Sequence, residues 1–196
     1  MPRELERAVT ELVVRILGAQ IIPTPSWLIR PGREECGQQW PLIQAIYRDL
    51  TGLELPDVMR SVERREVDAV LEIDGQPARI LEVDERQHFN EFRVTTLRHY
   101  AGNVPLAFDA AVWIERSEKK SRLEGGGFAK PKPPLFAGEN GRHRQRAFRD
   151  ALADILPPEH GLGPTLRIGD FEVKDWIFGG DSEERMRELL EAKPWL

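Results

Sequence analysis

The spacing of hydrophobic residues along the chain predicts an N-terminal helix and a central β-hairpin. Over Pro2–Leu17, hydrophobic residues recur every three or four positions, which is typical of an amphipathic helix, and Gly18 ends the run. Between residues 67 and 73, hydrophobic residues instead occupy every second position, the period of a strand. The pair Asp74-Gly75 then indicates a turn into a second hydrophobic strand over residues 78–84.

Similar patterns assign elements to the remainder of the chain. They predict helices over residues 38–50, 92–100 and 139–156, and strands over residues 107–115, 165–168 and 171–177. A last helix is predicted to begin with Asp181 as its N-cap, and Glu184 would complete a capping box. Three prolines within residues 21–32 predict a connector that packs on the core.

Together these elements predict an α/β protein with a small mixed β-sheet flanked by helices, followed by a C-terminal helix and strand extension. Residues 1–124 form the predicted core. Residues 125–138 are rich in glycine, proline and lysine and predict a flexible basic connector. Residues 139–196 are predicted to pack on the core as a helix-strand-helix extension. With 196 residues, the chain is long enough for one domain with a substantial hydrophobic core.

Composition narrows the class of protein and its compartment. The single cysteine, Cys36, excludes an internal disulfide framework and any multi-cysteine zinc or iron–sulfur site, and it fits a reducing compartment. No hydrophobic run approaches the ~20 residues that cross a bilayer. The charged N-terminus has no hydrophobic segment after it, so no secretory signal is visible. We therefore expect a soluble cytoplasmic protein without a membrane partner.

Charge is unevenly distributed along the chain. The formal net charge is −5, but residues 116–149 contain ten basic and three acidic side chains, so this segment carries +7 and the remainder −12. Such a segment can present a basic face to phosphates, or it can be a solvated surface whose arginines pair with acids elsewhere. On the first interpretation, the residues predicted to contact nucleic acid are Lys119, Lys120, Lys130, Lys132, Arg142, Arg146 and Arg149.

Acidic residues in the hairpin indicate a metal site. Glu82 and Asp84 lie two positions apart on one strand and therefore project from the same face. A two-residue hairpin loop would point Asp68 to the opposite face, whereas a three-residue loop, over residues 73–75 or 74–76, would place it on theirs. With the longer loop, three carboxylates would meet near His88. Gln87, just past the same strand end, would either hold a water or a base at this site or cap the strand end. Carboxylates in this arrangement suit Mg²⁺ or Mn²⁺.

The motif in this hairpin resembles that of a known nuclease superfamily. Arg65-Glu66-Val67-Asp68, followed after the turn by Leu81-Glu82-Val83-Asp84 and then Gln87-His88, is similar to the PD-(D/E)XK restriction-endonuclease-like pattern. The similarity is greatest to the branch that contains the very-short-patch-repair endonuclease.

This resemblance implies a restriction-endonuclease-like fold and a set of site residues. Asp68, Glu82 and the backbone carbonyl of Val83 would bind the metal, Asp84 would stand where the wider superfamily has lysine, and His88 would be the catalytic histidine. The superfamily often supplies a further acid from its first helix. Glu6 borders the hydrophobic face of the first predicted helix and is the candidate for that acid.

The chain departs from the pattern of this branch in two ways, and at position 84 it also differs from the wider superfamily. Glu85 stands where the branch usually has glycine, and the lone cysteine rules out a cysteine-built zinc site. Mismatch-specific nicking is therefore not expected. Aspartate in place of lysine at position 84 leaves open whether the site is active or degenerate.

We therefore expect a metal-dependent nuclease that hydrolyses DNA in restriction, repair or anti-phage defence. One alternative is a catalytically degenerate nucleic-acid-binding or partner-docking module. Another is a structural protein of a multi-component defence or repair system, with its basic segment against another subunit.

Overall fold

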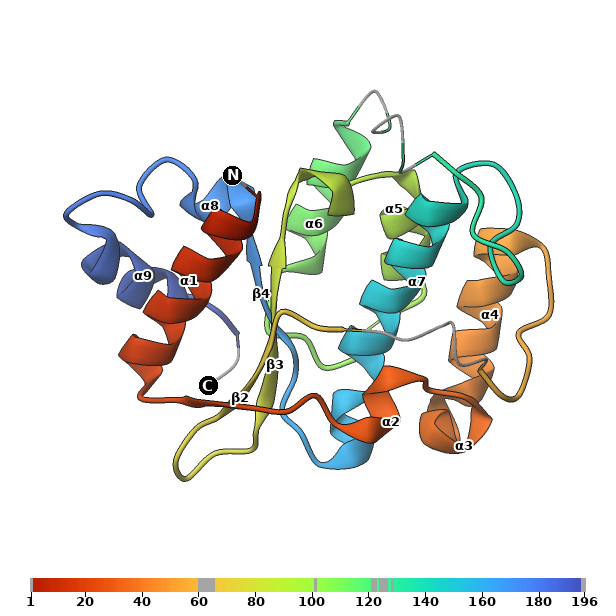
Figure 1. Ribbon diagram of the computed structural model, residues 1–196, viewed down its shortest axis with the longest axis horizontal. Coiled ribbons are helices and arrows are strands. Elements are labelled where there is room, and N and C mark those ends of the chain that lie inside the picture. The colour runs from red at the N-terminus through yellow and green to blue at the C-terminus, as the bar shows by residue number, and fades with distance from the viewer. Residues whose placement is uncertain are drawn as a thin grey trace.

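A four-stranded mixed β-sheet separates two groups of helices in the computed structural model of this protein (Figure 1). The structure describes residues 2–59, 66–100, 102–120, 123, 127 and 129–194. Three of its strands pair in antiparallel fashion, and the fourth lies parallel to its neighbour at one edge of the sheet. In sheet order, the strands are β1 (Gln20–Ile22), β2 (Ala69–Glu72), β3 (Arg79–Asp84) and β4 (Leu166–Gly169).

Helices cover both faces of the sheet. In Figure 1, α1 (Pro2–Leu17) and α9 (Ser182–Glu191) lie on one side of it, and α5 (Glu91–Arg98), α6 (Ala110–Glu118) and α7 (Gly141–Ile155) lie on the other. Helix α4 (Trp40–Thr51) packs against α7 on the side away from the sheet. The shorter helical segments are α2 (Ser26–Ile29), α3 (Arg33–Cys36), η1 (Gly37–Gln39), η2 (Arg86–His88), η4 (Pro157–His160) and α8 (Asp170–Val173).

The alternation of side chains along β3 explains why the two sides of the sheet differ. Leu81 and Val83 belong to a hydrophobic cluster that includes buried residues of α1 and α9. Glu82 and Asp84 project from the opposite face, toward α6 and α7, because successive strand residues point to opposite sides. Both acids are buried, at 6 % and 0 % exposure. The sheet therefore has one hydrophobic face and one face that carries charged side chains.

Most of the elements predicted from the hydrophobic pattern are present. The first helix has the predicted bounds, the hairpin is formed by β2 and β3, and the other helices agree within a few residues. Residues 21–32 contain part of β1 and all of α2. Leu135 and Phe136, at the end of the predicted basic connector, are buried in the core, and the Leu135 carbonyl accepts a hydrogen bond from Tyr47. No helix in the described ranges is long and apolar enough to cross a membrane.

Two of the predicted strands are wrong. Residues 107–115 fall largely in helix α6, which begins after Asp109, and the Asp109 carboxylate accepts a hydrogen bond from Ala111 N at 2.8 Å. This N-cap outweighs the β propensity of the short hydrophobic run. Residues 171–177 form α8 and turns, because the Glu172 carboxylate accepts a hydrogen bond from Gly169 N and stabilises the first helical turn.

The last helix begins where it is expected, but its capping box is not formed. Asp181 is the N-cap of α9 without a side-chain cap hydrogen bond. Its carboxylate instead accepts from Arg185 Nε at 2.7 Å, one turn further along the helix.

Candidate functional site

The register of the hairpin places Asp68 on the same face as Glu82. Ala69 pairs with Leu81 and Leu71 pairs with Arg79, and this register continues to Asp68 opposite Glu82. It leaves residues 74–76 as a three-residue loop, in which Gly75 has a φ of 70°. Only glycine adopts such a left-handed backbone at little cost. The longer of the two loops considered from the sequence is therefore the one that forms.

Burial and negative neighbours perturb the Asp68 carboxyl group. Asp68 precedes β2, and its Oδ2 accepts a hydrogen bond from Val83 N at 2.7 Å. Burial raises the pKa of Asp68 from its usual 3.8 to about 7, the Val83 hydrogen bond opposes this shift, and Glu6 and Asp84 add to it. Glu6 therefore lies close enough to Asp68 to act on it electrostatically. The Val83 backbone contacts Asp68 through its N–H, whereas the resemblance of the hairpin motif predicted a role for its carbonyl group.

This shift predicts a pH dependence of stability. Between pH 4 and 7 the folded protein holds a proton on Asp68 that the unfolded chain releases, so the contribution of this group to the free energy of unfolding falls as pH rises. Asp68→Asn removes the ionisation, so we expect this variant to gain stability relative to the wild type over that interval. Urea unfolding of both proteins at several pH values measures the difference. If the difference in the free energy of unfolding between the two proteins stayed constant with pH, this would contradict the raised pKa of Asp68.

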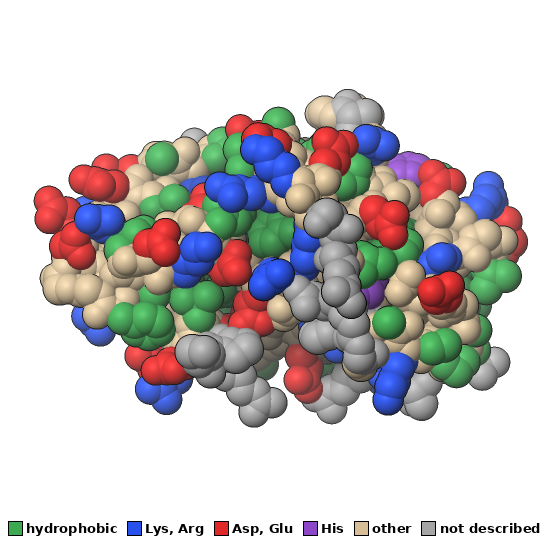
Figure 2. All heavy atoms as spheres, turned by 90° about the horizontal axis from the view of Figure 1, so that it is seen from above, with side chains coloured by type: hydrophobic (Ala, Val, Ile, Leu, Met, Phe, Trp, Pro, Cys, Tyr) green, Lys and Arg blue, Asp and Glu red, His purple; other side chains and the backbone are tan. Residues whose placement is uncertain are grey.

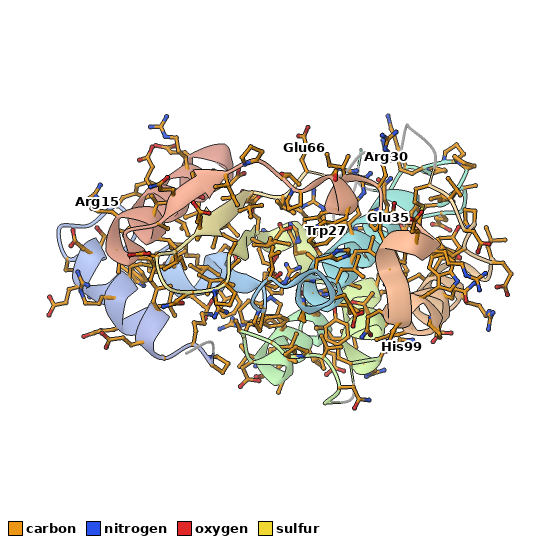
Figure 3. All side chains as sticks on the ribbon, turned by 90° about the horizontal axis from the view of Figure 1, so that it is seen from below. Arg15, Trp27, Arg30, Glu35, Glu66 and His99 are labelled. Atoms are coloured by element: carbon orange, nitrogen blue, oxygen red, sulfur yellow. The ribbon has the colours of Figure 1, made fainter. Side chains whose placement is uncertain are left out.

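A cleft of about 140 Å³ joins the hairpin acids to the basic residues of α7. Its acidic lining comes from the hairpin region and from Asp150, and its basic lining comes from one stripe of α7. Glu66, labelled in Figure 3, is exposed and projects outward. The residues that line the cleft are Glu66, Asp68, Glu82, His88, Arg142, Arg146, Arg149 and Asp150.

Both ring nitrogens of His88 have partners. Nδ1 lies 3.0 Å from Asp150 Oδ2 and 3.3 Å from Asp84 Oδ1, and Nε2 lies 2.8 Å from Arg146 Nη1. A guanidinium group can only donate, so Nε2 accepts from Arg146 and Nδ1 carries the proton that points toward the carboxylates. Asp150 therefore holds the orientation of the imidazole ring.

Asp84 belongs to a buried ion network beneath the cleft. Its Oδ1 accepts from Arg167 Nη1 at 2.6 Å, and its Oδ2 accepts from Trp113 Nε1 at 2.7 Å. Arg167 Nε also donates to Asp154 at 2.7 Å, and Asp154 pairs with Arg93 at the same distance. Asp84 does not line the cleft. Asp84 is therefore placed to hold the side chains of Arg167 and His88 in position.

The same network determines the ionisation of Asp150. Burial by itself raises the pKa of this carboxyl group, but its interactions with His88 and with the Arg167 guanidinium outweigh burial and hold the pKa well below the usual range. Asp150 therefore remains a carboxylate that accepts from His88 Nδ1.

Two groups of side chains are candidates for a metal ion. Asp84, His88 and Asp150 each offer a ligand atom within 4.8 Å of the others and could hold an ion. Their atoms, however, already hydrogen-bond to Arg167, Trp113 and one another. Asp68 and Glu82 line the open cleft and offer carboxylate oxygens, the ligands that Mg²⁺ and Mn²⁺ prefer. A cation beside Asp68 would also offset the negative neighbours that raise its pKa.

Several residues predicted for the site lie elsewhere. Gln87 donates to Glu85 and lines a separate pocket with Glu4, Asp170 and Phe178. Gln87 therefore lies outside the cleft that Asp68 and Glu82 line. The physical reason is that Gln87 and His88 are successive residues of the 3-10 helix η2, whose three residues per turn point neighbouring side chains in different directions.

Four of the predicted nucleic-acid contacts also do not line the cleft. Lys119 pairs with Glu115 on α6, and Lys120 donates to the Arg86 carbonyl. Lys130 and Lys132 are exposed in the segment before α7. On the face shown in Figure 2, basic and acidic side chains are interspersed. Arg65 of the motif lies outside the described residues.

The sequence interpretation missed Asp150 and Arg167. Asp150 follows Arg146 by four residues on α7, so helical spacing alone would have placed it on the same face. Arg167 lies between Leu166 and Ile168 in a predicted strand, and a charged residue between hydrophobic ones in a covered sheet indicates a buried ion pair. Its register partner across the sheet is Glu82.

Comparison of this chain with models of protein families, with curated proteins and with solved structures found no match.

Proposed function

We propose that this protein is a metal-dependent nuclease of restriction-endonuclease-like fold that hydrolyses phosphodiester bonds in DNA. One observation carries the proposal: a single cleft joins Asp68 and Glu82 of the hairpin to Arg142, Arg146 and Arg149 of α7. Arginines bind phosphate oxygens through charge-assisted hydrogen bonds, and the two carboxylates suit a hard divalent cation. The resemblance of the hairpin motif adds restriction, repair or anti-phage defence as the biological setting.

We assign a role in this reaction to each side chain of the cleft. Mg²⁺ or Mn²⁺ held by Asp68 and Glu82 would polarise the phosphoryl oxygen and lower the pKa of a bound water. The arginines hold the phosphate in the cleft. As the water oxygen bonds to phosphorus, His88 Nε2 takes a proton from that water, and the bond between phosphorus and the leaving ester oxygen breaks. Asp150 holds Nδ1–H throughout, and the leaving oxygen takes a proton from solvent.

Incubation with supercoiled plasmid tests the proposal. We expect nicked or linear product in Mg²⁺ or Mn²⁺ and intact plasmid in chelator, together with DNA binding that weakens as salt rises. Salt-dependent binding without cleavage in either metal would contradict hydrolysis and support the binding-module alternative. Absence of binding at low salt would favour a role in docking a protein partner.

A further inference from the structure

One ring nitrogen of His88 is engaged by a residue that also lines the cleft. Arg146 Nη1 lies 2.8 Å from His88 Nε2, while Asp150 lies 3.0 Å from Nδ1. Because Nε2 accepts a hydrogen bond from Arg146, it cannot take a proton from water at the same time. The protein without substrate therefore has its candidate base occupied by an arginine.

Arg146 is also placed to meet a phosphate. It lies in the middle of a stripe on α7, one turn from Arg142 and nearly one turn from Arg149, and all three line the cleft. A guanidinium donates two parallel hydrogen bonds to an anionic phosphate, each stronger than one to a neutral ring nitrogen. A phosphodiester in the cleft therefore competes with His88 for Arg146, and the phosphate has the advantage.

We propose that Arg146 is a positioning residue that couples phosphate binding to the availability of His88. A phosphodiester in the cleft draws the guanidinium from His88 Nε2, and this nitrogen is then open to the attacking water. Asp150 and Asp84 retain Nδ1–H during the exchange, so the ring stays in place. This inference rests on the proposed function, because it concerns the same cleft and the same class of substrate.

The experiment is ¹⁵N NMR of the histidine rings, with a DNA oligonucleotide added in chelator and inorganic phosphate as a second probe. The chain has four histidines, and His88→Gln identifies the His88 signal. In the free wild type we expect a protonated Nδ1 and an Nε2 that accepts a hydrogen bond. Addition of DNA should shift the Nε2 signal toward that of an imidazole nitrogen that accepts no hydrogen bond from a guanidinium group.

Two variants separate this role from general loss of charge. In Arg146→Met the Nε2 signal should already be shifted in the free protein, and DNA should add nothing. In Arg149→Met the slope of log binding constant against log salt concentration should decrease by about one, which corresponds to one phosphate contact fewer. At saturation, however, the His88 shift should equal that of the wild type. Circular dichroism tests whether each variant folds. If Arg146→Met does not fold, the His88 shifts of the wild type and of Arg149→Met on addition of DNA test the role of Arg146.

The outcomes distinguish this inference from the proposed function. Plasmid cleavage with no change of the His88 signal on saturation would overturn the role of Arg146 and leave the nuclease standing. A His88 shift on binding without any cleavage would support the role of Arg146 and contradict hydrolysis. Absence of any shift with either DNA or phosphate would overturn the role of Arg146.

Discussion

We expect Glu82→Gln to reduce metal-dependent plasmid nicking by at least ~100-fold, because loss of even an outer-shell partner of a metal ligand typically costs 10–100-fold. The amide keeps the size of the side chain but removes the negative charge that a divalent cation requires. Glu82 lies opposite Asp68 across the hairpin, and both line the cleft, so Asp68→Asn should have an effect of similar size. The initial rate of conversion of supercoiled to nicked plasmid measures both.

Glu72→Gln is the matched control for this prediction. Glu72 lies on the same hairpin, is exposed and does not line the cleft, so its substitution should leave the nicking rate within about twofold of the wild type. Thermal melting of each variant separates loss of function from loss of fold. Full activity of folded Glu82→Gln and Asp68→Asn would refute the assignment of the metal ligands.

The second large effect concerns stability. Arg167→Met should lower the free energy of unfolding by about 3–5 kcal/mol, the usual cost of removing one partner of a buried ion pair. The Arg167 guanidinium contacts Asp84 at 2.6 Å and Asp154 at 2.7 Å, and all three side chains have no exposed surface. Methionine fills much of the same space but leaves Asp84 buried without its guanidinium partner. Urea unfolding monitored by circular dichroism gives the difference.

Arg187→Met serves as the comparison for that measurement. Arg187 pairs with Glu183 on α9, and both side chains are about half exposed, at 52 % each, so the pair contributes little and the variant should unfold at nearly the wild-type urea concentration. If Arg167→Met were as stable as Arg187→Met, the buried network would not contribute to the stability of the fold. Asp84 would then be available for another role, including metal binding.

The hairpin shows how much of the candidate site local patterns could predict. The alternation of residues predicted both strands, but an Asp-Gly pair is compatible with loops of two or three residues. A two-residue loop would have turned Asp68 toward the hydrophobic layer between the sheet and α1, where a carboxylate has a high desolvation cost. Packing of the whole sheet therefore selected the three-residue loop, and no window of a few residues contains that information.

The wrongly predicted strand over residues 107–115 has a similar cause. The hydrophobic run at residues 110–114 fits a strand or a helix, and the Asp109 cap together with burial of Trp113 against the sheet made it a helix. The expectation that Asp84 binds the metal rests on the strand face that it shares with Glu82. Its actual partners, Trp113 and Arg167, come from segments 29 and 83 residues further along the chain.

The sequence by itself determined helices α1, α4, α5, α7 and α9, the hairpin, and the concentration of acidic side chains on one strand face, because these follow from the period of hydrophobic residues and from local turns. Only the tertiary structure decided that Asp68 faces Glu82, that Asp150 and Arg146 hold the two nitrogens of His88, and that Gln87 lies apart. These relations join α7 and β4 to the hairpin across long separations in the chain. They depend on how the layers pack, which local periodicity does not encode.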